Sequence, residues 1–228
     1  MNSITVADVR RYWDARSCNI RHSQQPVGTK AYFDEVEARK YLVEPHIPAF
    51  ADFNRWKGKK VLEVGCGIGT DTMNFARAGA TVSAVDLSSE SLAVARKRAD
   101  VFELSDRIKF YQANAEELSR VVPVEPYDLV YSFGVIHHTP NPRGVILEIM
   151  KYLNADSELR VMLYAKYSWK SLLIALGLAQ PEAQTGCPIA FSYSSNGVRD
   201  LLAGLTVTSI AKDHIFPYQI EAYKNTNM

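Results

Sequence analysis

The stretch that decides the fold is Val61-Leu62-Glu63-Val64-Gly65-Cys66-Gly67-Ile68-Gly69-Thr70-Asp71. Its apolar start is typical of a buried strand, and its end can begin a helix. The glycines between them permit positive φ and let a ligand approach the backbone closely. The spacing is G-x-G-x-G, not the G-x-G-x-x-G of dinucleotide sites, and no Gly-Lys-Ser/Thr follows as in a P-loop. The pattern predicts strand, turn and helix; the alternative is a purely structural turn.

Short apolar strands alternate with amphipathic helices on both sides of this turn. We expect strands at 60–64, 81–85, 108–112, 128–132 and 159–164, and a late strand at 205–211. This alternation predicts an α/β fold with a doubly wound, mostly parallel sheet. Right-handed crossovers place the strand-end loops on one rim of such a sheet, where ligands bind.

The first part of the chain follows another pattern. Residues 1–56 carry two helical patterns with aromatic faces and contain no strand, so these helices must pack on something else. We therefore expect a helical unit over 1–56, packed on a core that spans 57–228.

Composition bounds the function classes. The 228 residues carry 26 Lys plus Arg against 25 Asp plus Glu, for a net charge of +1, and 47% are hydrophobic. This is a globular composition without the basic excess typical of duplex nucleic-acid binding. Three cysteines without metal-ligand spacing indicate reduced thiols and no metal site. No signal peptide is visible, and the longest apolar run, 172–179, is too short to span a membrane. We expect a soluble, cytoplasmic protein.

Two further positions point to an adenosine. Asp86 ends the second expected strand, about 20 residues after the first glycine, where a carboxylate accepts ribose hydroxyls. Leu87 would then lie against the adenine. Asn114 and the Ala115 amide follow the third strand and could bond the adenine edge. The alternatives are that Asp86 caps the helix near Ser89 and that Asn114 caps the turn after it.

Together with Tyr127-Asp128-Leu129-Val130-Tyr131-Ser132-Phe133-Gly134-Val135-Ile136-His137-His138, these features resemble the class I S-adenosylmethionine-dependent methyltransferases, small-molecule branch. The matching residues cover about 59–153. The resemblance implies a Rossmann-like sheet of seven strands with an antiparallel last strand, for which the C-terminus leaves little chain. It also implies S-adenosyl-L-methionine as cofactor and S-adenosyl-L-homocysteine as product. The implied cofactor contacts are Glu63, Gly65, Cys66, Gly67, Gly69, Asp71, Asp86, Leu87, Asn114, Ala115, Ser132, Phe133 and Gly134.

The resemblance also gives the N-terminal helices a role as a lid over the cofactor. The aromatic residues Tyr12, Trp13, Tyr32 and Phe33 would wall the pocket, or else be ordinary core residues. Arg39 or Lys40 would meet the methionine carboxylate.

The expected reaction is in-line displacement at the sulfonium methyl, toward an oxygen or nitrogen of a small metabolite with anionic or polar character. His137 and His138 follow the fourth strand on the active rim and are the candidate bases; the alternative is that they shape the turn before Pro140. Other functions are a non-catalytic cofactor-binding or partner protein and, less favoured, a nucleic-acid or metalloid methyltransferase. A second copy of the chain could cover an exposed last strand.

Overall fold

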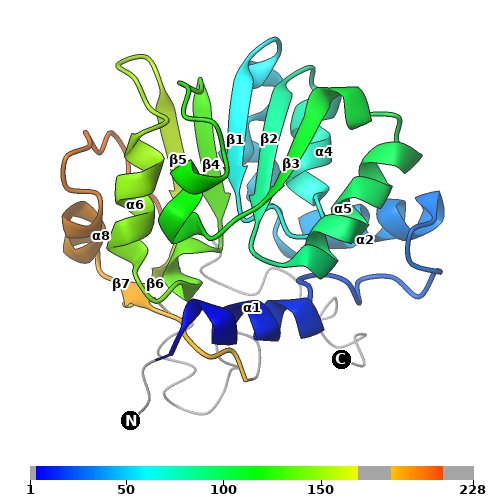
Figure 1. The fold of residues 1–228 in the computed structure, drawn as a ribbon, viewed down its shortest axis with the longest axis horizontal. Helices are drawn as coiled ribbons and strands as arrows, with labels where there is room; N and C mark the ends of the chain where they lie inside the picture. Colours follow the sequence, from blue (N-terminus) through cyan, green and yellow to red (C-terminus); the bar gives the residue numbers. More distant parts are fainter. Residues whose placement is uncertain (1–3, 169–185, 213–228) are drawn as a thin grey trace.

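The computed structural model describes residues 4–168 and 186–212. Its central sheet has five parallel strands in the order β3-β2-β1-β4-β5 (Figure 1). These strands are β1 (Lys60–Val64), β2 (Thr81–Asp86), β3 (Ile108–Gln112), β4 (Leu129–Phe133) and β5 (Glu158–Met162). The predicted α/β fold with a doubly wound parallel sheet is confirmed. The chain changes direction across the sheet between β1 and β4, which is where ligands bind in such folds.

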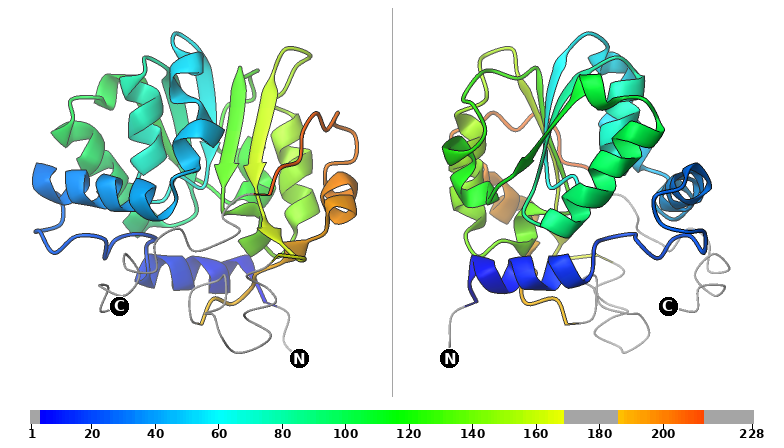
Figure 2. Two further views of the ribbon diagram at one scale, coloured as in Figure 1. Left: turned by 180° about the vertical axis from the view of Figure 1, so that it is seen from behind. Right: turned by 45° about the vertical axis from the view of Figure 1, so that its right-hand side comes forward.

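Helices cover both faces of the sheet (Figure 2). The α-helices of the described residues are α1 (Val6–Ala15), α2 (Lys30–Val43), α3 (Ile47–Ala51), α4 (Thr70–Arg77), α5 (Ser89–Val101), α6 (Pro142–Met150) and α8 (Ser195–Leu201). Short 3-10 turns are η1 (Phe53–Trp56), η2 (Ser105–Arg107), η3 (Ala115–Arg120) and η4 (Ile136–His138). Buried side chains from α3, η1, α4 and α5 pack on one face, and those from η3, α6 and α8 pack on the other.

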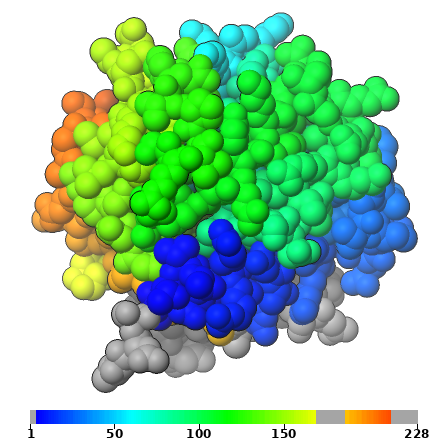
Figure 3. Space-filling view, viewed as in Figure 1, coloured from blue at the N-terminus to red at the C-terminus, as the bar shows by residue number. Residues whose placement is uncertain are grey.

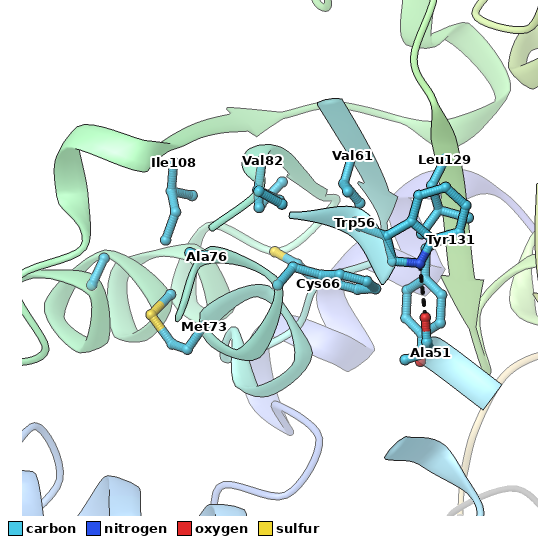
Figure 4. Close-up of a cluster of buried hydrophobic side chains, with 14 of the residues drawn as sticks. Ala51, Trp56, Val61, Cys66, Met73, Ala76, Val82, Ile108, Leu129 and Tyr131 are labelled. Carbon is cyan, nitrogen blue, oxygen red and sulfur yellow. Dashed lines mark hydrogen bonds between the residues drawn. The ribbon is translucent and has the colours of Figure 1, made fainter. Parts of the chain in front are cut away.

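The core explains why β1 and β2 read as continuous apolar runs. Strand β1 is buried after its first residue, and β2 is buried from Val82 to Val85, because both faces of the sheet are covered. Figure 4 shows Val61, Val82 and Leu129 from neighbouring strands lying above the buried helix residues. The Trp56 indole Nε1 donates to the Ala51 carbonyl at 3.0 Å, so its polar atom is satisfied inside the core.

Helices α1 and α2 both lie at the carboxyl-end side of the sheet, but they are packed differently. Helix α1 runs across the strand ends (Figure 1), and in Figure 3 its dark-blue atoms lie directly against the green surface of the central part of the chain. Tyr32 and Phe33 of α2 are completely buried with Val36 and Ile68. These two aromatic residues therefore belong to the core, whereas Trp13 of α1 lies beside the cavity described below.

The C-terminal part of the prediction needs correction. The strand expected at 205–211 is absent: residues 206–212 form no strand or helix, and no backbone hydrogen bond of the described residues joins them to β5. Thr206, Thr208 and Ile210 are exposed, so the alternating pattern there has no layer to pack against. The strand expected at 159–164 is divided into β5 and a short β6 (Tyr164–Ala165), which pairs in parallel with β7 (Ser192–Tyr193).

The sequence also predicts a short helix near 169–176 and a loop at 180–188, and it leaves 217–223 for a last strand. The helix, the last strand and most of the loop lie outside the described residues. Across 4–168 and 186–212, no helix is long and apolar enough to cross a membrane. The same residues contain no group of three or more metal-ligating side chains placed to hold an ion.

Candidate active site

A continuous cavity of about 2080 Å³ opens at the carboxyl ends of the strands and extends along β5. It exceeds the ~300–1,000 Å³ typical of a single small-molecule site, so it has room for two ligands side by side. Its walls include the glycine turn, the end of β2, the turn after β3 and the residues after β4 and β5. The rim predicted to hold the ligands is therefore the one that is hollowed.

The glycine turn needs its glycines for two different reasons. Gly65 has φ +85°, and a Cβ there would lie 2.2 Å from Cγ2 of Val135, so no side chain fits. Gly67 has φ +53° and nothing within 4 Å of its would-be Cβ among the described residues, so it faces open space in the cavity. The amides of Gly65 and Cys66 both donate to the Val85 carbonyl, at 2.7 and 2.9 Å. A rigid backbone shelf with free space above it suits a ligand lying flat against the turn.

Asp86 links the turn to the second strand. Its Oδ2 accepts from the Gly67 amide at 2.7 Å and its Oδ1 from the Ser88 amide at 2.8 Å. Burial raises the pKa of its carboxyl, although the two amides oppose the shift. The N-cap of α5 is Ser88, whose Oγ accepts from the Ser91 amide, so Asp86 is not needed as the cap. Asp86 and Leu87 both line the cavity.

Asn114 and Ala115 line the cavity beside this carboxylate. The Oδ1 atom of Asn114 accepts from the Glu116 amide at 3.1 Å, so Asn114 caps the turn after it, as the alternative prediction has it. Its side-chain NH₂ is oriented by that bond, and the residue occupies both positions foreseen: the cap of η3 and the wall of the cavity.

Two of the predicted cofactor residues form a buried polar cluster behind the turn. Asp71 accepts from Lys40 Nζ at 2.8 Å, from the Tyr41 hydroxyl at 3.0 Å and from the Tyr131 hydroxyl at 3.0 Å. Glu63 accepts from the hydroxyl of Thr72 at 2.5 Å. Burial, together with the Asp71 carboxylate, raises the pKa of Glu63 to about 8.

Neither carboxylate of this cluster lines the cavity, but Lys40 does. Lys40 is the candidate named for the methionine carboxylate, and its Nζ also lies 5.8 Å from the ring centre of Phe133. Asp71 therefore acts on the cavity through Lys40, whose ammonium it holds in place.

The remaining predicted contacts also fall into two groups, those that line the cavity and those that lie behind the turn. Cys66, Phe133 and Gly134 line the cavity. Gly69 has φ +78° and is the N-cap of α4, and Ser132 is fully buried with its hydroxyl donating to the Val64 carbonyl at 3.0 Å. These last two support the turn from behind.

The two histidines are placed very differently. His138 lines the cavity, and its Nδ1 lies 2.8 Å from the Ile189 carbonyl, so Nδ1 carries the proton and Nε2 is the accepting nitrogen. Burial lowers the pKa of His138. His137 is fully buried, does not line the cavity and has no hydrogen-bond partner for either ring nitrogen within the described residues. Burial and then the neighbouring His138 lower the pKa of His137 to about 2.

Sequence reasoning missed the residues that hold His138 in place. Ile189 and Cys187, whose Sγ lies 3.4 Å from His138 Nδ1, come some fifty residues later in the chain. The Phe191 amide donates to the His137 carbonyl at 2.9 Å and ties the same segment down. No spacing in the sequence signals contacts made across such a separation.

The family model described as "Methyltransferase domain" matches residues 56–183. A ubiquinone biosynthesis O-methyltransferase of Actinobacillus pleuropneumoniae is 37% identical over 105 residues, which are 45% of this chain and 44% of that protein. One of Glaesserella parasuis is 30% identical over 123 residues, 53% of this chain and 51% of that protein. This chain thus aligns with about half the length of these curated relatives.

Solved structures agree on the fold. Magnesium protoporphyrin IX methyltransferase from Synechocystis PCC 6803 with bound SAH superposes with a TM-score of 0.63 at 20% identity, over 87% of each chain. The [4+2]-cyclase SpnF gives 0.61 at 18% identity, over 90% of this chain and 74% of that one. The glycine turn, the β2 carboxylate and the matched domain together lead to one conclusion: this chain belongs to the class I S-adenosylmethionine-dependent methyltransferase family.

Proposed function

We propose that this protein transfers the methyl group of S-adenosylmethionine to an oxygen of a small, planar acceptor. The observation that carries the proposal is His138: a cavity-lining imidazole whose Nδ1 is engaged by a carbonyl, leaving Nε2 to take a proton. The names of the relatives, O-methyltransferases of ubiquinone biosynthesis, favour oxygen over nitrogen as the accepting atom.

The residues around the glycine turn fit this cofactor. The free space over Gly67 takes its methionyl part, and the adjacent Asp86 carboxylate accepts the ribose hydroxyls. Asn114 and Ala115 border the adenine, and Lys40 binds the carboxylate of the methionyl part. When bound, the cofactor supplies an electrophilic methyl group on a sulfonium.

Two groups of aromatic rings flank the remaining part of the cavity. On one side, Trp13 and Tyr164 both lie edge-on to His138, at 5.5 and 5.4 Å between ring centres. On the other, Phe133 packs against Phe50 at 5.9 Å, and both line the cavity. Aromatic walls of this kind favour a flat, aromatic acceptor such as a phenol.

The proton of the acceptor then has a defined destination. A phenolic hydroxyl would give its proton to Nε2 of His138, and the imidazole would then be protonated on both nitrogens. The phenolic oxygen would take the methyl group as the bond between methyl and sulfur breaks, which leaves S-adenosylhomocysteine. Because its lowered pKa keeps His138 neutral at pH 7, the imidazole is ready to act as the base. The bond from Nδ1 to Ile189 fixes the ring orientation throughout.

Calorimetric titration with S-adenosylhomocysteine, followed by transfer of labelled methyl to catechol and to aniline, tests the proposal. We expect binding, transfer to catechol in preference to aniline, and weaker binding, about tenfold or more, in Asp86→Asn, which loses a charged acceptor for the ribose hydroxyls. Methylation of aniline in preference to catechol would contradict the choice of oxygen. Tight cofactor binding without transfer to any acceptor of a wider panel would favour the non-catalytic cofactor-binding protein.

A further inference from the structure

The largest fully buried side chain of the described residues is a cation, Arg98 of α5, and it plays no part in the proposed chemistry. It is 0% exposed. Full burial of a guanidinium is costly unless its protons are well satisfied, so its partners are informative.

Arg98 joins three elements at once. Its Nη1 donates to the hydroxyl of Thr70 at 2.6 Å, and Thr70 is the first residue of α4, directly after the last glycine of the turn. Its Nη2 donates to the Phe33 carbonyl at 3.2 Å and to Glu37 Oε2 at 2.9 Å, both in α2. One planar fork therefore bridges the cofactor turn and the N-terminal helix, which a lysine could not do with the same geometry.

Glu37 strengthens this bridge from the other side. Its two carboxylate oxygens accept from Arg77 Nη1, at 2.7 and 2.9 Å, and Arg77 ends α4. Further along α2, Lys40 bonds to Asp71, the residue that follows Thr70. The first two residues of α4 are thus held by groups that are themselves fixed by α2.

We propose that Arg98 is a positioning residue for cofactor binding, which holds Thr70 and the exit of the glycine turn in register with α2. Thr70 lines the cavity, whereas Arg98 does not, so Arg98 acts through it. Helix α2 is accordingly part of the framework of the cofactor site. This inference rests on the proposed cofactor function but needs no particular acceptor.

A double-mutant cycle on S-adenosylhomocysteine affinity tests the inference, because a merely structural arginine would not couple to Thr70 in ligand binding. We expect Arg98→Lys and Thr70→Val each to raise the dissociation constant about tenfold, as loss of a charge-assisted hydrogen bond implies. The double variant should be scarcely worse than either single one. The matched control is Arg96→Lys, an exposed position two residues earlier in the same helix, which should change affinity less than twofold.

The outcomes distinguish a failure of the proposed function from a failure of the role assigned to Arg98. If the wild-type protein does not bind S-adenosylhomocysteine, the proposed function fails and takes this inference with it. If the wild type binds and Arg98→Lys lowers stability but leaves affinity like that of Arg96→Lys, or if the two effects multiply independently, Arg98 is only a packing residue. Should Arg98→Lys fail to fold, Glu37→Gln and Thr70→Val each remove a single acceptor, and Glu37→Gln must then weaken binding for the inference to stand.

Discussion

The cavity has two halves that are built in different ways. The cofactor half lies around Gly65–Gly67, Asp86 and Asn114, and the acceptor half lies around His138 and β5. Strand β1 is buried from its second residue onward and β2 from Val82 to Val85, and backbone bonds to the Val85 carbonyl fix the turn that follows β1. Strand β5, by contrast, is half-buried at every residue, and the short β6 and β7 pair over two residues each. The histidine turn is held by the segment around Ile189, far along the chain. The cofactor half is thus a local, rigid unit, while the acceptor half is assembled from distant pieces.

The largest effect should come from Gly65→Ala, because Gly65 is the position in the cofactor half with the least space for a side chain. The new methyl would collide with Val135 and adopt a strained positive φ. We expect unfolding free energy to fall by about 3 kcal/mol or more, with loss of S-adenosylhomocysteine binding. Chemical denaturation measures the unfolding free energy, and calorimetry measures S-adenosylhomocysteine binding.

The matched control is Gly67→Ala, where no described atom lies within 4 Å of the added methyl. It should cost about 1 kcal/mol of stability through φ alone and still weaken binding, because the methyl enters the cofactor space. Equal stability losses in both variants would show that the two glycines do not have separate roles.

The comparison also explains how far the sequence could predict the molecule. The cofactor half follows from contiguous signals: an apolar strand, glycines at fixed spacing, and Asp86 at the end of the next strand. The sequence does not separate residues that face the cavity from those behind it, and it therefore predicts Glu63, Asp71 and Ser132 as cofactor contacts alongside residues that line the cavity. That distinction depends on side-chain direction, which the partners Thr72, Lys40 and the Val64 carbonyl fix for these three residues in turn.

In the acceptor half, local pattern was a weaker guide. Residues 205–211 alternate like a strand but lack a neighbour to pair with among the described residues. His137 and His138 looked equivalent because adjacent residues share every sequence signal. Their difference arises from Ile189 and from the burial of one ring, neither of which local spacing encodes.

The second prediction concerns catalysis in the acceptor half. His138→Gln should lower kcat about 100-fold, the usual share of a general base, and leave S-adenosylhomocysteine affinity within twofold. Because burial lowers the pKa of His138, wild-type kcat should be level around pH 7 and decline only below the ordinary histidine pKa of 6.5. Steady-state kinetics from pH 5 to 8 measures this. An acidic limb that persists unchanged in His138→Gln would remove the assignment.

A smaller effect is expected from Glu63→Gln in the cluster behind the turn. Its folded-state pKa of about 8 lies above the ordinary 4.5, so between these values the folded protein holds a proton that the unfolded chain has released. Stability therefore falls as pH rises across this interval, by about 1 kcal/mol from pH 7 to 8. Glu63→Gln should abolish that decline in denaturant unfolding. The pKa values of His22 and His137 are lowered to about 4 and 2, so these histidines change stability only below the ordinary histidine pKa of 6.5. They therefore do not contribute between pH 7 and 8. A variant with the same decline as wild type would place the proton elsewhere.

The smallest effect should come from Trp13→Leu, which tests where the boundary between the halves lies. The Trp13 ring meets His138 edge-on and lies on the acceptor side of the cavity. Losing one aromatic contact should raise the acceptor KM about threefold. Affinity for S-adenosylhomocysteine should stay unchanged if α1 serves the acceptor half alone. The segment directly after α1 lies on the cofactor side, however, because the Ser17 hydroxyl is hydrogen-bonded to the Ser91 hydroxyl at 2.9 Å. Ser17→Ala is therefore the complementary variant, expected to alter cofactor affinity and not acceptor KM. If both substitutions changed both the acceptor KM and the S-adenosylhomocysteine affinity, α1 and the segment after it would contribute to both halves of the cavity. The separation into two halves would then apply to the strand ends but not to α1.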